Sequence, residues 1–417
     1  MGQFRKTFIL LIFVFGCVGL ERFVAAFVLP GIQKDFALNY AQAGSIIGVF
    51  AIAWAIGVWA MGSLSDYVGR KPVIVVLTIL GGIFSWLSGL AGGLASLLVI
   101  RGVMGFVEGG IWAPLAATIS EESPPLARAR NVALPIALFI LLGGAVAPIL
   151  SSQLMAVYGW RAVFFFYAVP AVVLGLLILV VMKEPPSTRA IIAARRSGAR
   201  KAKRLDAEGK EIGYRDVLKY RNIIAMTGIW TFNMAFLWLF TTFTMPYMMK
   251  VHQLPFTTAG MIMSAFGVAS CIGLPLFGAI SDRFGRKPTL IVSQLLCGVM
   301  AIVFGGLSLG TTASFLVLFL MLAAVGSGGG AAIIQASCAE TVGFAMAATA
   351  MGMVTGIGEF IGGGIFPVLG GNIADKIGLP STLYLAGVVA IVGGLIGFFV
   401  RETAPVIVSR GQPLVAS

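Results

Sequence analysis

Apolar runs of roughly twenty residues or more recur along the whole chain, separated by short charged or Gly/Pro-rich breaks. A run of about this length is long enough to cross the hydrocarbon core of a bilayer as an α-helix. The 417 residues are 59% hydrophobic and only 11% charged, whereas soluble domains carry about 25% charged residues. A transmembrane β-barrel would instead show short segments of alternating hydrophobicity. The sequence therefore predicts an all-α polytopic membrane protein. It predicts twelve spans, at about 7–30, 41–64, 72–92, 95–120, 130–156, 161–183, 221–248, 257–280, 288–309, 313–339, 344–373 and 380–400.

Lysine and arginine are distributed unevenly between the breaks, and cytoplasmic loops of membrane proteins carry the excess of these residues. An even number of spans places both termini on the same side. The richer side holds Arg5, Lys6, Arg70, Lys71, Arg128, Arg130, Arg283, Arg286, Lys287, Arg401 and Arg410, and the poorer side holds Lys34, Arg161, Lys250 and Lys376. We therefore expect both termini in the cytoplasm, in a multi-pass protein of a bacterial inner membrane.

One long hydrophilic break divides the spans six and six. It predicts an N-terminal six-helix bundle at 1–183, a basic cytoplasmic linker at 184–220 and a C-terminal six-helix bundle at 221–417. The linker contains RRSGARKAKR, which supplies part of the net charge of +13. Contact with anionic lipid explains such a run better than nucleic-acid binding, and we expect no nucleic-acid partner.

The two halves repeat. The stretch from Phe50, FAIAWAIGVWAMGSLSDYVGRKPVIVV, aligns with FGVASCIGLPLFGAISDRFGRKPTLIV from Phe266 at a constant offset of 216. The shared pattern is G-x-x-S-D-x-x-G-R-K-P, and each copy lies where an apolar span meets the cytoplasm. Two related six-helix units facing each other across a central path are typical of secondary transporters.

Four ionisable residues interrupt two apolar spans. Glu21 and Arg22 lie in the first span, and Arg101 and Glu108 lie in the fourth. Arg101 and Glu108 are seven residues apart, so on a helix they share a face, about 10.5 Å apart along the axis. Glu21 could pair with Arg101 and Arg22 with Glu108, although the sequence does not fix the partners. Structural ion pairs between two helices are the alternative, but burying an ion pair gains little stability, so function is favoured.

The doubled motif resembles the signature loop of the major facilitator superfamily, and twelve spans with a central linker extend that resemblance over the whole chain. The resemblance implies a cytoplasmic latch that holds the halves together in the outward-facing state. Physically, the aspartates can accept backbone N–H groups at a helix start, and the basic residues can bridge to acids on neighbouring helices. The alternative is that these residues only set topology and a tight glycine turn. The latch residues are Asp66, Arg70, Lys71, Asp282, Arg286 and Lys287.

LERFVAAFVLPGIQKDF and RGVMGFVEGGIWAP resemble the first and fourth helices of the anion:cation symporter family, with Glu21 in place of the usual aspartate. The resemblance implies that Arg22 binds a substrate carboxylate, that Glu21 and Glu108 carry protons, and that Arg101 tunes or pairs them. Arginine stays protonated when buried and offers a planar fork for a carboxylate. If the anion and Glu108 compete for Arg22, substrate binding is coupled to protonation.

The C-terminal half lacks these charges at equivalent positions and is expected to contribute shape and hydrogen bonds. Candidate substrate ligands there are Trp238, Asn233 and Gln335, with Trp230 nearby in sequence. Glu359 is either a third proton-carrying group facing the path or a residue buried against neighbouring helices. The glycines around it permit close packing and bending, so this eleventh span is a candidate moving part.

These features predict a proton-coupled transporter that imports a small organic anion by alternating access, functioning as a monomer. The alternative is a proton-driven efflux antiporter for amphipathic compounds, although Arg22 and Arg101 would oppose cationic drugs. A non-transporting sensor on the same fold is a further alternative. We find no metal-binding cluster, nucleophile elbow or phosphate loop, and therefore expect no enzyme activity, cofactor or metal.

Overall fold

The computed structural model describes residues 2–124, 127–196, 216–342, 344–405 and 407. Within these residues the chain is built from helices, and twelve of them are long and apolar enough to cross a membrane, as the sequence predicts. The first six spans are formed by α1 (Gly2–Phe27), α3 (Tyr40–Val68), α4 (Arg70–Gly89), α5 (Leu94–Gly109), α6 (Trp112–Glu122), α7 (Arg128–Ile140), η2 (Leu141–Val146), α8 (Ala147–Tyr158) and α9 (Trp160–Val181). The short helix α2 (Leu29–Phe36) connects the first span to the second.

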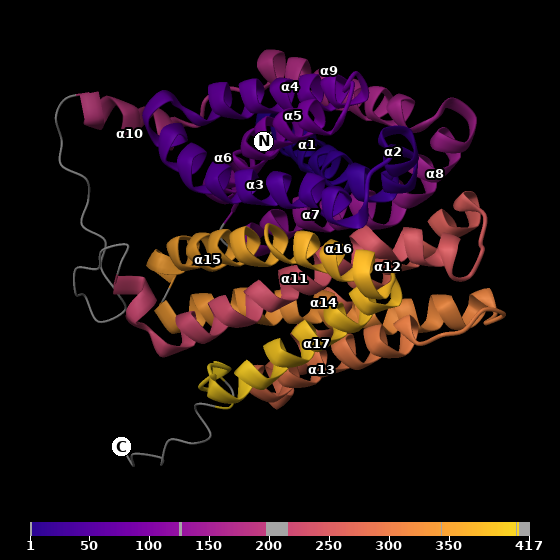
Figure 1. The fold of residues 1–417 in the computed structure, drawn as a ribbon. Helices are drawn as coiled ribbons and strands as arrows, with labels where there is room; N and C mark the ends of the chain where they lie inside the picture. The colour runs from indigo at the N-terminus through magenta and orange to yellow at the C-terminus, as the bar shows by residue number, and fades with distance from the viewer. Residues whose placement is uncertain (1, 125–126, 197–215, 343, 406, 408–417) are drawn as a thin grey trace, which may run out of the picture.

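The last six spans are formed by α11 (Arg221–Lys250), α12 (Phe256–Phe284), α13 (Arg286–Gly305), α14 (Ala313–Val342), α15 (Phe344–Gly358), η4 (Glu359–Gly363), α16 (Phe366–Ile377), α17 (Pro380–Ile396) and η5 (Gly397–Phe399). Figure 1 shows the two sets as separate bundles lying against each other. The predicted linker contains α10 (Pro186–Arg196) and η3 (Asp216–Lys219), and most of its basic run lies outside the described residues.

The two bundles are built on the same packing pattern. α3 packs on α5 and α4 packs on α9 in the first bundle, and α12 packs on α14 and α13 packs on α17 in the second. Glycines at equivalent positions allow the first of these approaches. A Cβ at Gly57 would lie 2.1 Å from the carbonyl oxygen of Phe106, and a Cβ at Gly273 would lie 2.3 Å from that of Val325. Helices without a Cβ at the crossing approach closely, and the resulting van der Waals packing contributes to helix association in lipid.

The repeated motif forms a sharp turn in each bundle. Gly69 ends α3 with φ of 108°, and Gly285 ends α12 with φ of 103°. These are left-handed backbone conformations that a side chain disfavours. The next helix begins at Arg70 or Arg286, so both basic residues lie at a helix N-terminus. The predicted glycine turn is therefore present in both copies.

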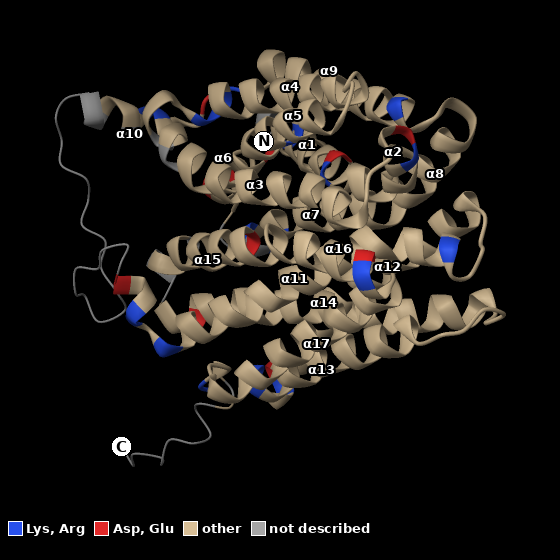
Figure 2. Cartoon of the chain, in the orientation of Figure 1, with Lys and Arg blue, Asp and Glu red and all other residues tan. Residues whose placement is uncertain are grey.

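Two short π-helices occupy equivalent spans, η2 in the fifth and η4 in the eleventh. A π-turn holds one residue more than an α-turn and is frequently found at functional sites. η4 begins at Glu359, which lies inside its membrane span. Figure 2 shows that most charges of the described chain lie instead near the ends of the helices.

The bundles meet through α3 with α16, and through η2 and α8 with α12. At one end of the molecule Asp375 of α16 accepts the backbone N–H groups of Tyr40 and Ala41, at 2.8 and 3.0 Å. These are free N–H groups at the start of α3, so a carboxylate of one bundle caps a helix of the other.

Candidate functional site

Arg22 lies on α1 and is buried between the two bundles, with its side chain 7% exposed. Its Nη2 lies 2.7 Å from Oε1 of Glu359, which is 2% exposed and belongs to the opposite bundle. The guanidinium carbon lies 4.0 Å from the centre of the Trp54 ring and 5.1 Å from that of Trp238. A desolvated cation is attracted to such rings, so the aromatic walls stabilise the buried charge in addition to the ion pair.

Glu359 also accepts a hydrogen bond from its own bundle. Nε1 of Trp238, on α11, donates to the same Oε1 atom at 2.7 Å. One carboxylate oxygen therefore binds a guanidinium from the first bundle and an indole N–H from the second. Glu359 is thus buried between the bundles, and its partner is the arginine that the resemblance assigns to substrate. The predicted pairing of Arg22 with Glu108 is wrong.

Arg101 is fully buried on α5 and contacts main chain rather than a carboxylate. Its Nη1 and Nη2 atoms donate to the carbonyl oxygens of Glu21 and Arg22, at 3.4 and 3.3 Å. The Phe50 ring lies 4.3 Å from the guanidinium carbon. The predicted ion pair of Arg101 with the Glu21 carboxylate is therefore not formed. Arg101 instead fixes the turn of α1 that positions the Arg22 side chain, because it binds the backbone carbonyls of Glu21 and Arg22.

Glu21 and Glu108 are both buried, and their side chains converge on Gly81 of α4. A Cβ at Gly81 would lie 3.8 Å from Oε2 of Glu21 and 3.6 Å from Cγ of Glu108. Both oxygens of Glu108, and Oε1 of Glu21, have no hydrogen-bond partner within the described part of the chain. A buried carboxylate without a donor is costly when ionised. The geometry thus brings two buried carboxyl side chains together, with three of their four oxygens lacking a donor in the described part of the chain.

In the described part of the chain, the remaining predicted ligands form no hydrogen bond with the Arg22–Glu359 pair. Asn233 is buried inside the second bundle, where Nδ2 approaches the carbonyl oxygen of Ser327 on α14 at 3.5 Å. Gln335 is exposed on α14. Trp230 is buried, and its Nε1 has no partner among the described residues. Of the four C-terminal candidates, only Trp238 contacts the charged pair.

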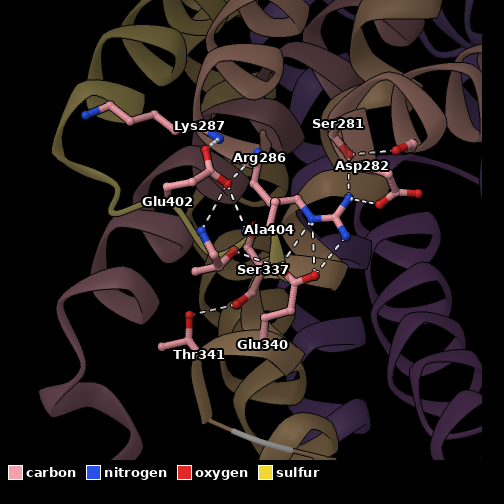
Figure 3. Close-up of polar contacts among 11 residues, drawn as sticks. Ser281, Asp282, Arg286, Lys287, Ser337, Glu340, Thr341, Glu402 and Ala404 are labelled. Atoms are coloured by element: carbon pink, nitrogen blue, oxygen red, sulfur yellow. Dashed lines mark hydrogen bonds and ion pairs between the residues drawn. The ribbon is translucent and has the colours of Figure 1, made fainter. Parts of the chain in front are cut away.

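The two copies of the motif form matching polar clusters. In the second bundle, Arg286 pairs with Asp282 at 2.6 Å and with Glu340 of α14 at 2.8 Å (Figure 3). Glu402 accepts the backbone N–H groups of Arg286 and Lys287, at 2.7 and 3.1 Å. The acceptor at the start of α13 is thus Glu402 and not Asp282, which instead binds the Arg286 side chain.

The first bundle repeats this arrangement. Glu184 accepts the backbone N–H groups of Arg70 and Lys71 at 2.6 and 3.0 Å, and Arg70 also binds Glu121 of α6. The side chain of Asp66 lies outside the described residues. Glu184, in the predicted linker, and Glu402 were missed as site residues. The repeat could have identified them, because each glutamate follows a basic residue directly after the last span of its half.

We expect Glu402→Ala to lower the thermal unfolding midpoint of the protein in detergent. The Glu402 carboxylate also accepts the N–H groups of Thr403 and Ala404, at 3.0 and 2.9 Å. Leaving these donors and the start of α13 without an acceptor should cost about 1–3 kcal/mol of stability. Glu402→Gln keeps one acceptor oxygen and is the matched control. An equal loss in both variants would show that charge, and not capping, is the source of the stability.

A membrane protein whose two related halves meet at buried charged side chains is built like a carrier that alternates between the two sides of a bilayer. The chain belongs to the Major Facilitator Superfamily: the model of that family matches residues 11–245 and again residues 231–415. This family consists of transporters, and the chain is a transporter of this fold and not an enzyme.

Curated relatives match the chain over most of its length. A probable 4-methylmuconolactone transporter of Cupriavidus pinatubonensis is 26% identical over 86% of this chain and 81% of its own length. A hexuronate transporter of Bacillus subtilis is 26% identical over 97% and 95%, and a gentisate transporter of Corynebacterium glutamicum is 26% identical over 90% and 83%. Among solved structures, a bacterial homologue of the human lysosomal transporter Spinster superposes with a TM-score of 0.79 at 17% identity, covering 99% of both chains. That likeness confirms the fold.

Proposed function

We propose that this protein imports a small organic carboxylate together with protons by alternating access. The observation that carries the proposal is the ion pair of Arg22 with Glu359, because it shows that the arginine between the bundles already binds a carboxylate. Relatives named for hexuronate and gentisate transport support an organic acid as the substrate. We place the protein in a bacterial inner membrane, with both termini in the cytoplasm and the Asp375 end of the molecule outside.

The charges of the site favour co-transport of the acid with protons. Five charged side chains are buried in this region: Arg22 and Glu359 between the bundles, and Arg101, Glu21 and Glu108 within the first bundle. If all are ionised, the site carries one net negative charge and repels an anion. Each proton taken up removes one negative charge, and charge interactions are strong in a buried site of low dielectric constant. An organic anion is therefore bound best after a proton has been loaded, which is the requirement for symport.

The walls of the site favour an acid with an apolar or aromatic body. The rings nearest the Arg22 guanidinium belong to Trp54, Trp238, Phe23 and Phe139. Aromatic faces bind apolar rings well, but they offer no partner for the hydroxyl groups of a sugar acid. Each hydroxyl that loses water without gaining a hydrogen bond weakens binding. We therefore propose a compact aromatic or otherwise apolar carboxylate as the preferred substrate.

The experiment is uptake into proteoliposomes with an imposed inward proton gradient. The panel holds benzoate, gentisate, glucuronate, short mono- and dicarboxylates and cationic dyes. We expect accumulation of an aromatic acid that is lost when the gradient is collapsed, with glucuronate carried at least about tenfold more slowly, since unpaired hydroxyls cost one or more kcal/mol. Faster glucuronate uptake would overturn the substrate class. Dye movement without acid uptake would overturn the whole proposal in favour of efflux, and no flux of any compound would favour the sensor.

The two motif clusters are proposed to act in the conformational cycle. In this structure, each cluster joins helices of its own bundle through Arg70 or Arg286. We propose that the clusters attach one bundle to the other at this end in the outward-facing state, as the family resemblance implies. At the opposite end, Asp375 caps α3 across the bundles, so this contact must break when the outside opens.

A further inference from the structure

We propose that the Glu359 carboxylate competes with the substrate carboxylate for Arg22. Glu359 occupies the substrate's binding position on this arginine until a proton neutralises it. This inference rests on the proposed function and deepens it, because it makes Glu359 a proton-coupling and specificity-determining residue. Nothing in the pattern shared with the anion:cation symporters assigns a role to this position.

Glu359 accepts hydrogen bonds from both bundles. Its Oε1 atom takes one hydrogen bond from Nη2 of Arg22 and one from Nε1 of Trp238, both at 2.7 Å. The donors come from opposite bundles, so any carboxylate that binds both would draw the bundles together. That is the requirement for a substrate that closes its own site. The glutamate makes the same contacts without a substrate and therefore competes for them.

Glu359 leaves one donor of Arg22 without a partner. The Nε atom of Arg22 is buried and has no hydrogen-bond partner within the described residues. Arginine binds carboxylates most strongly with two parallel N–H groups. Glu359 binds with one oxygen, through Nη2 alone. A free carboxylate is not held by a helix and can place one oxygen on Nη2 and the other on Nε, which would satisfy the orphaned donor.

The backbone at Glu359 is not a regular α-helix. The residue begins the π-helix η4, which packs on α11 and α3. A Cβ at Gly363 would lie 2.8 Å from Nε1 of Trp238, so the absence of a side chain lets η4 approach the indole. A π-turn that moves by one residue rotates the side chains within it by about 100°. The glutamate thus has a route away from Arg22 that needs no unfolding of the span.

The charged group that faces Glu359 is Arg22. Two of the helices packed around η4 contribute uncharged side chains here. Trp238 of α11 donates to Glu359, and Trp54 of α3 lies against the Arg22 guanidinium. The ionisable residues described on α3, α11 and α16 lie near the helix ends, and α15 has none. Glu21 and Glu108 belong to the first bundle, where Arg101 binds the Glu21 carbonyl oxygen and the charge of Glu108 acts on both Arg101 and Arg22. A proton on Glu359 therefore acts directly on the arginine, since it removes the anion that holds Nη2.

The test is the affinity of the purified protein for benzoate in detergent, measured by calorimetry between about pH 6 and 8, where a carboxylic acid probe stays ionised. If one proton must bind Glu359 before benzoate binds Arg22, this step contributes about a tenfold loss of affinity per pH unit. In Glu359→Gln we expect affinity at pH 8 at least about tenfold higher than in the wild type. We also expect the slope of log affinity against pH to fall by about one. Glu122→Gln is the matched control, because it makes the same change at the end of α6, outside the site, and it should keep the wild-type affinity and slope.

Weaker binding in Glu359→Gln with an unchanged slope would overturn the inference and make Glu359 a structural partner of Arg22. If Glu359→Gln does not give a monodisperse protein, Glu359→Asp serves in its place. Its shorter side chain keeps the charge but reaches Arg22 less well, so tighter binding with an unchanged slope is expected, and weaker binding would overturn the inference. If wild-type protein neither binds nor accumulates any acid of the panel, the proposed function itself fails. If the wild type binds and only the glutamine variant behaves otherwise than expected, this inference alone fails.

Discussion

Arg22→Ala is expected to lower carboxylate uptake at least about 100-fold. A hydrogen bond to a charged group contributes about 1.5–3 kcal/mol, and a carboxylate on Arg22 would lose two of them. Since 1.4 kcal/mol corresponds to a factor of ten, the loss is about two orders of magnitude or more. The measurement is the initial rate of acid uptake into proteoliposomes, normalised to the amount of folded protein.

The control for this variant follows from the structure. Arg22→Ala leaves Glu359 buried without its ion-pair partner, which in other proteins costs about 3–5 kcal/mol of stability. The double variant Arg22→Ala, Glu359→Gln removes both charges and should recover the unfolding midpoint without recovering uptake. Arg22→Lys keeps the charge but lacks the fork, so it should retain only part of the activity. Wild-type uptake by the stable double variant would show that Arg22 is not the anion site.

Glu108→Gln is expected to abolish proton-driven accumulation while exchange of labelled for unlabelled acid continues. Glu108 is fully buried, shares its surroundings with Glu21, and has no hydrogen-bond partner within the described chain. Glutamine keeps the shape of the side chain but cannot take up or release a proton. For each coupled proton, a gradient of one pH unit supplies about 1.4 kcal/mol, or about tenfold accumulation. The variant should lose this gradient-driven accumulation entirely.

The measurement compares accumulation under a proton gradient with exchange at equal pH on the two sides. Glu122→Gln is the matched control, because it makes the same change near the end of α6, in the same membrane span but outside the cluster. It should accumulate the acid as the wild type does. An unchanged response of Glu108→Gln to the gradient would remove Glu108 from the coupling scheme and leave Glu21 and Glu359 as the proton carriers.

The sequence alone was sufficient for the membrane class, the twelve spans and the repeat. These are local properties: a span is a run of apolar residues, and a repeat is a pattern at constant offset. The glycine turns at Gly69 and Gly285 were predictable for the same reason. Both glycines have a positive φ, and glycine adopts this backbone conformation at little cost whatever the tertiary structure around it. Four residues of the candidate site, Glu21, Arg22, Arg101 and Glu108, were found because charge within an apolar span is rare and costly.

Only the tertiary structure decided which of these charges meet. Arg22 pairs with a glutamate 337 positions away, Arg101 binds the carbonyls of α1, and Glu402 in place of Asp282 caps α13. Each buried donor had several possible acceptors of similar chemistry in the sequence. The choice among them depends on the rotation and height of one helix against another, and differences of a few ångströms decide whether an ion pair forms. Those positions are set by the packing of all twelve spans together, so no single stretch of sequence contains them.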